Sequence, residues 1–111
     1  MKINFNMNLI NELTKADPKS LIERTLKLSE ENGEVSEAVL SYGKVNGSQY
    51  KNKKIEDVEE ECLDVIMVAL SIISQINDNE VTEEKIKHIE ELFETKLKKW
   101  EDKNCKGGKV I

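Results

Sequence analysis

A chain of 111 residues with one proline, five glycines and a charged fraction of 35% has the composition of a single helical domain with a limited core. Its net charge of −5 argues against a protein that binds duplex nucleic acid, because such proteins usually carry a basic face. The longest apolar stretch, residues 62–73, contains Asp64 and is shorter than the roughly 20 residues that cross a bilayer, so no membrane contact is expected.

The two cysteines and the N-terminal residues indicate the cellular compartment. Cys62 and Cys105 lack the CxxC spacing of a redox or metal site, and the first residues lack the apolar core of a signal peptide. Cys62 falls within the apolar stretch and is expected to be a small buried side chain. A reduced, cytoplasmic protein is the simplest interpretation.

Two helices are predicted in the first part of the chain. A short one lies around residues 9–15, and a longer one begins with Asp17 as N-cap and Pro18 in the first turn. It runs to about Tyr42, where Gly43 is a plausible stop. Its apolar positions follow the spacing of a helix, at Leu21, Leu28, Val35 and Tyr42.

Two more helices are predicted after a linker at residues 43–54, which has four lysines and no acidic residue. The third helix spans 55–76 and ends at the polar residues 77–79. Thr82 can cap the fourth, and residues 105–111 read as a loose basic tail. The expected fold is all-α, an antiparallel bundle of about four helices in one domain (1–111) with its core at 17–104, completed by association of chains. The fourth helix carries an apolar stripe at Ile86, Ile89, Phe93, Leu97 and Trp100.

Asp64 is a charge in an otherwise apolar run, and Glu61 lies three positions before it on the same helix face. A buried carboxylate is costly unless a cation or hydrogen bonds compensate its charge. No basic residue lies within a turn on that helix, so a positive group must come from elsewhere. A metal ion is the leading candidate.

The second helix has a matching pair of carboxylates. Glu31 and Glu34 fall on the same seam as Leu28 and Val35, so two packed helices would bring four carboxylates together. Oxygen ligands of this kind suit Mg²⁺ or Mn²⁺ better than zinc. Gly33 lies between the two glutamates and suggests close approach of a ligand or of a neighbouring helix. The plainer alternative is solvated surface charge, since 22 of the 111 residues are acidic.

Other chemistries find less support. A di-iron carboxylate bundle needs Glu-x-x-His pairs, but the single histidine, His88, follows Lys85 at that spacing. Trp100, Tyr42 and Tyr50 could stack on a base, although Trp100 also continues an apolar stripe and fits a core or an interface. The sequence shows no recognisable Cys/His or Ser/His/Asp grouping for nucleophilic catalysis.

The carboxylates occur within two longer motifs. The segment 26–38 contains Glu-Glu-x-x-Glu, and the segment 59–66 contains Glu-x-x-Asp. Together they resemble the two motif helices of the MazG-like all-α nucleoside triphosphate pyrophosphohydrolases, over roughly residues 17–76. The resemblance implies Mg²⁺-dependent cleavage of a nucleoside triphosphate to the monophosphate and pyrophosphate, in house-cleaning or nucleotide-pool control, by a homodimer or tetramer.

The same resemblance implies roles for single residues. It makes Glu31, Glu34, Glu61 and Asp64 the Mg²⁺ ligands, with Mn²⁺ as a substitute. Glu30 and Glu34 are the candidate catalytic carboxylates, without a choice between them. Candidate phosphate-binding lysines are Lys53 or Lys54 before the third helix, and Lys96, Lys99 and Lys103 on the fourth. A non-catalytic helical interaction or regulatory module that keeps the fold is the rival hypothesis.

Overall fold

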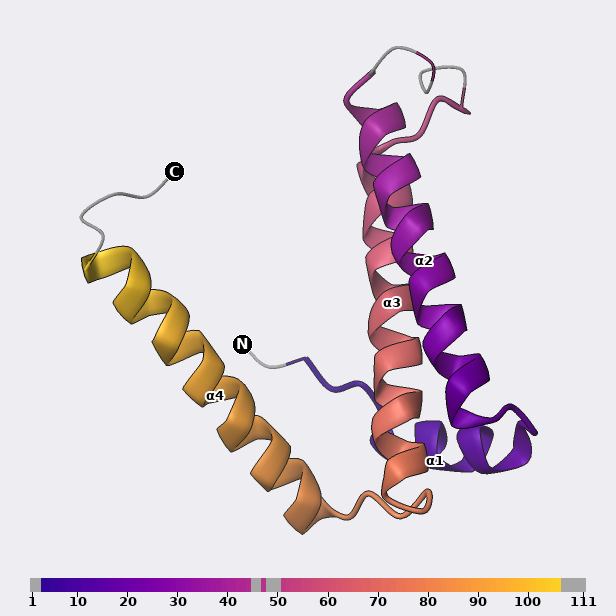
Figure 1. Cartoon of the computed structure of the whole chain (residues 1–111), viewed down its shortest axis with the longest axis vertical. Coiled ribbons are helices and arrows are strands. Elements are labelled where there is room, and N and C mark those ends of the chain that lie inside the picture. Colours follow the sequence, from indigo (N-terminus) through magenta and orange to yellow (C-terminus); the bar gives the residue numbers. More distant parts are fainter. Residues whose placement is uncertain (1–2, 45–46, 48–50, 107–111) are drawn as a thin grey trace. The chain divides into compact units, whose positions relative to one another are not determined.

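The computed structural model describes residues 3–44, 47 and 51–106. This part of the chain contains four helices and no strand, which confirms the predicted all-α class (Figure 1). The helices are α1 (Met7–Ala16), α2 (Leu21–Tyr42), α3 (Ile55–Ile76) and α4 (Glu83–Lys106). The chain divides into two compact units, with α1, α2 and α3 in the first, residues 1–80, and α4 in the second, residues 81–111.

The start of α2 differs from the prediction. Asp17 is extended and closes α1, because a residue that precedes a proline is disfavoured in the helical region. The N-cap of α2 is Ser20, whose Oγ accepts the Glu23 N–H at 3.1 Å, while the Glu23 carboxylate accepts the Ser20 N–H at 2.9 Å. This reciprocal capping box holds the pKa of Glu23 below its usual range, mainly through the bond from the Ser20 backbone.

The pair formed by α2 and α3 is the framework of the first unit, and α1 packs on α3 (Figure 1). The two long helices lie side by side and run in opposite directions, because the linker after Gly43 brings the chain back along α2. Ala38 is only 1% exposed on the α2 side. Close by, the buried Ser41 hydroxyl accepts the Lys53 N–H at 3.0 Å and so ties the end of the linker to α2.

A buried guanidinium joins the three helices of this unit. Arg24 is 5% exposed, and its Nε donates to Gln75 Oε1 at 2.7 Å. Its Nη2 donates to the carbonyl oxygens of Thr14 at 3.1 Å and Asp17 at 3.2 Å. A buried charge of this kind is stable only when its donors find acceptors, and the acceptors of this α2 side chain lie on α3 and at the end of α1.

The end of α3 and the start of α4 agree with the sequence prediction, and the end of α4 differs from it. Asp78 and Asn79 adopt left-handed backbone with φ of 56° and 59° and stop α3, as the polar run 77–79 predicted. The Thr82 Oγ1 accepts the Lys85 N–H at 3.2 Å at the start of α4. The predicted loose tail from residue 105 is corrected in part, because α4 continues to Lys106, and residues 107–111 lie outside the described part.

Much apolar surface of α2 and α3 is exposed. Ile22 is 73% exposed on α2, and Leu63 and Met67 are 54% and 56% exposed on α3. The expected burial of Cys62 is wrong, because its side chain is exposed. One face of α3 packs on α2 and part of the helix also contacts α1, whereas side chains on its remaining surface are exposed. None of the described helices is long and apolar enough to cross a membrane.

Candidate metal centre

The two carboxylate pairs predicted from the sequence come together between α2 and α3. One oxygen each of Glu31, Glu61 and Asp64 lies within 4.8 Å of the others, close enough to share one ion. Glu30, Glu31 and Glu34 form a second group by the same measure. Glu31 belongs to both groups, so all four predicted metal ligands are in one cluster.

Glu31 is the centre of this cluster because it lies on the face of α2 that packs against α3. It is 7% exposed, which confirms the core-facing position expected from the Leu28–Val35 seam. Its Oε1 pairs with the ammonium of Lys27, one helical turn earlier, at 3.1 Å. Its Oε2 is buried without a hydrogen-bond partner among the described residues. An anionic oxygen in that position is destabilising unless a cation reaches it.

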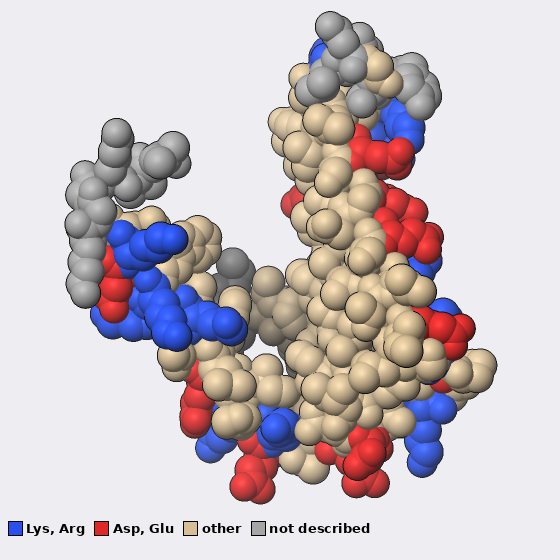
Figure 2. Space-filling view, viewed as in Figure 1, with Lys and Arg blue, Asp and Glu red and all other residues tan. Residues whose placement is uncertain are grey.

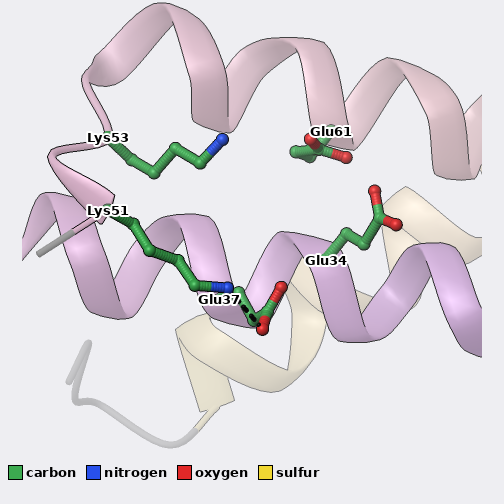
Figure 3. A pocket seen from close by; sticks show the side chains of 5 residues that line it. All are labelled: Glu34, Glu37, Lys51, Lys53 and Glu61. Carbon is green, nitrogen blue, oxygen red and sulfur yellow. Dashed lines mark hydrogen bonds and ion pairs between the residues drawn. The ribbon is translucent and has the colours of Figure 1, made fainter. Parts of the chain in front are cut away.

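Glu61 is the corresponding buried carboxylate on α3. Its Oε2 is also buried without a partner in the described part of the chain, and its carboxylate faces Glu34 across the helix pair (Figure 3). Removal from water raises the pKa of Glu61 first of all, and the facing Glu34 carboxylate raises it further through a shared hydrogen bond and its charge. The charges of Asp64 and Glu31 act in the same direction.

Lys27 compensates only part of this negative charge. Its ammonium lies 3.1 Å from Glu31 Oε1 and 3.2 Å from Glu30 Oε1, and these two carboxylates raise its pKa above the usual value. Glu34, Glu61 and Asp64 receive no ion pair from it. Carboxylate oxygens are the ligands that Mg²⁺ and Mn²⁺ prefer, so the chemistry of the donor set fits a hard divalent cation.

The two candidate catalytic carboxylates differ in environment. Glu30 is exposed on α2 and is held by Lys27, whereas Glu34 is half-buried and belongs to the cluster that could hold a metal. Both are within reach of a ligand at the cluster. Gly33 lies between them, and a Cβ there would meet no atom within 4 Å outside its own helix backbone. The suggested close approach of a neighbouring helix at Gly33 is therefore wrong.

The candidate lysines fall in different places. Lys54 is the N-cap residue of α3, and its N–H donates to Asp57 Oδ2 at 2.8 Å. Lys96, Lys99 and Lys103 are exposed on the C-terminal half of α4, where basic side chains gather in Figure 2. The acidic side chains of the first unit form a row along one edge of the α2–α3 pair in the same view.

A polar pocket adjoins the carboxylate cluster and contains two lysines of the linker. Its volume is about 380 Å³, and it is lined by Glu34, Glu37, Lys51, Lys53 and Glu61 (Figure 3). Lys53 was one of the sequence candidates, whereas Lys51 was not. The signal that could have identified Lys51 is the lysine-rich, acid-free composition of the linker. Comparisons with protein-family models, with curated protein sequences and with solved structures find no match for this chain.

Proposed function

We propose that this protein is a Mg²⁺-dependent nucleoside triphosphate pyrophosphohydrolase of the MazG-like type. The observation that carries the proposal is the cluster around Glu31, in which two helices contribute carboxylates and two buried oxygens have no partner among the described residues. The motif resemblance of segments 26–38 and 59–66 supplies the substrate class and the bond that is cleaved.

The reaction needs a cation, a proton acceptor and a positioned water. A bound Mg²⁺ would screen the phosphate charge and acidify a nearby water. Glu31, Glu61 and Asp64 would hold the ion, and Glu34 or Glu30 would accept the proton of the attacking water. Water adds to one phosphorus of the α–β bridge, the bridging bond breaks, and pyrophosphate leaves with the monophosphate as the other product.

A panel of nucleoside and deoxynucleoside triphosphates tests this proposal. We expect purified protein with Mg²⁺ to release monophosphate and pyrophosphate, which phosphorus NMR distinguishes, and we expect a chelator to abolish the activity. The Glu31→Gln variant should lose activity, whereas Glu59→Gln, an exposed neighbour on α3, should retain it. Release of orthophosphate and a diphosphate would contradict the family assignment.

A helical interaction module without catalytic activity is the second candidate function. The observation that favours it is the exposed apolar surface of α2 and α3, which includes Ile22, Leu26 and Met67. Under this alternative the protein binds a partner through that surface and shows no turnover with any nucleotide in the panel. The same experiment therefore separates the two functions.

A further inference from the structure

The pocket beside the carboxylate cluster has walls of opposite charge. Glu34 and Glu61 belong to the candidate metal centre, and Lys51 and Lys53 come from the linker before α3 (Figure 3). A volume of about 380 Å³ is in the range of small-molecule sites, roughly 300–1,000 Å³. A ligand in this pocket would therefore contact the metal centre and the lysines at the same time.

Lys53 is held in place by its backbone while its ammonium stays available. Its N–H donates to the buried Ser41 hydroxyl at 3.0 Å, which fixes the linker against α2. Its Nζ makes no ion pair or hydrogen bond with any described residue and points along the pocket toward the side of Glu61 (Figure 3). An anchored backbone with a free cationic end is suited to binding an anion.

Lys51 is held by an exchangeable ion pair. Its Nζ lies 2.7 Å from Glu37 Oε1, and this contact lowers the pKa of Glu37 below its usual value, with a smaller contribution from the charge of Lys53. Glu37 is mostly exposed, so the pair is weak in water. A ligand with a stronger negative charge could compete with Glu37 for the Lys51 ammonium.

We propose that Lys51 and Lys53 bind the non-bridging oxygens of a Mg²⁺-bound polyphosphate, at the end of the pocket that the linker forms. A polyanion cannot enter beside Glu34 and Glu61 unless cations separate the like charges. The metal would do so at one end of the ligand and the two ammonium groups at the other. This inference rests on the proposed function for its metal, and it names residues for a chain of linked phosphates, whether inorganic or part of a nucleotide.

Calorimetric titration with tripolyphosphate in the presence of Mg²⁺ tests the inference. We expect Lys51→Met and Lys53→Met each to weaken binding by about tenfold, as loss of a charge-assisted contact implies. Lys44→Met, which removes an exposed linker charge that does not line the pocket, is the matched control and should bind like the parent. Glu37→Gln should tighten binding severalfold, because it removes the carboxylate that competes for Lys51.

Titration with Mg²⁺ alone separates failure of this inference from failure of the proposed function. Both lysine variants should bind Mg²⁺ like the parent, because neither supplies a metal ligand. Unchanged tripolyphosphate binding in both lysine variants, with Mg²⁺ binding intact, would overturn the inference and leave the function standing. Binding that persists in EDTA and disappears in the lysine variants would overturn the inference in its present form, because the lysines would then bind polyphosphate without Mg²⁺.

Discussion

At the scale of single residues, the balance of charge around Glu31 governs the candidate site. One of its oxygens is paired with Lys27, and the other is buried without a partner in the described part of the chain. On α3, Glu61 Oε2 is likewise buried without a partner among the described residues. The cluster thus holds more negative charge than its own lysine compensates, and a divalent cation would remove the excess.

The first prediction concerns the ligands on α3. We expect Glu61→Gln and Asp64→Asn to reduce Mg²⁺ affinity by roughly ten- to a hundredfold, since a hydrogen bond or contact of a charged group contributes about 1.5–3 kcal/mol. Isothermal titration calorimetry measures the change, with Glu59→Gln as the control on the same helix. The melting temperature of the metal-free variants should rise, because repulsion in the cluster decreases. Parental Mg²⁺ affinity in both variants would mean that the site lies elsewhere.

The second prediction concerns pH and the metal-free protein. The folded state raises the pKa of Glu61, chiefly by removing it from water, so the native state binds this proton more tightly than the unfolded chain. The stability from this group is then fully present below the pKa of an unfolded glutamate and is lost as pH rises through the higher folded pKa. Urea unfolding in EDTA at several pH values should show the parent losing stability relative to Glu61→Gln across this window. A constant difference between the two proteins would contradict the prediction.

At the scale of elements, the helices show which sequence signals are strong. Periodic apolar residues and polar stops predicted α3 at its observed bounds, Ile55–Ile76, and α2 to its observed end at Tyr42. The start of α2 was missed because Asp17 and Ser20 are both good N-cap residues. The Glu23 partner in the capping box selects Ser20, and Asp17 instead closes α1 as its C-cap residue.

The third prediction belongs to α2. Gly33 lies inside the helix with open space around its Cα, so a methyl group would fit there without displacing a neighbour. We expect Gly33→Ala to raise the free energy of unfolding by about 1 kcal/mol, the difference in helix propensity between the two residues. Chemical denaturation measures this, and Ser36→Ala, a change at an exposed position on the same helix, indicates the size of an ordinary surface effect. A destabilised Gly33→Ala protein would show that this glycine has a conformational or packing role.

The candidate site was predictable in its acidic half and not in its basic half. Asp64 is conspicuous because it interrupts an apolar run, and Glu31 because it replaces an apolar residue on a seam. Lys51 belongs to no periodic pattern, and its place beside Glu37 depends on the path of the linker. The burial of Arg24 was not predicted for a different reason, since a basic residue in a charged helix is normally exposed to solvent.

At the scale of the whole molecule, the apolar surface predicts association. Large apolar side chains stay exposed on both long helices of the first unit, including Ile22, Leu26, Leu63 and Met67. Symmetric pairing of two chains would bury such a surface, most often about a two-fold axis. We therefore predict a homo-oligomer, a dimer in preference to a tetramer, with α3 near the centre of the contact.

Light scattering at micromolar concentration measures the mass that this fourth prediction requires. Met67→Glu, which introduces a charge at an exposed position of α3, should shift the population toward single chains. Leu92→Glu, a similar change at an exposed apolar position of α4, is the matched comparison and should have the smaller effect. The mass of a single chain together with full nucleotide hydrolysis would contradict the prediction.

The guanidinium of Arg24 also bears on the order in which the chain becomes structured. Its Nη2 satisfies the carbonyl oxygens of Thr14 and Asp17, which end α1, from a position on α2, and its Nε binds Gln75 near the end of α3. A helix of 10 residues such as α1 is marginal in isolation. The last turn of α1 thus gains this donor only when α1 is docked against α2, so α1 should open before α2 and α3 in native-state hydrogen exchange.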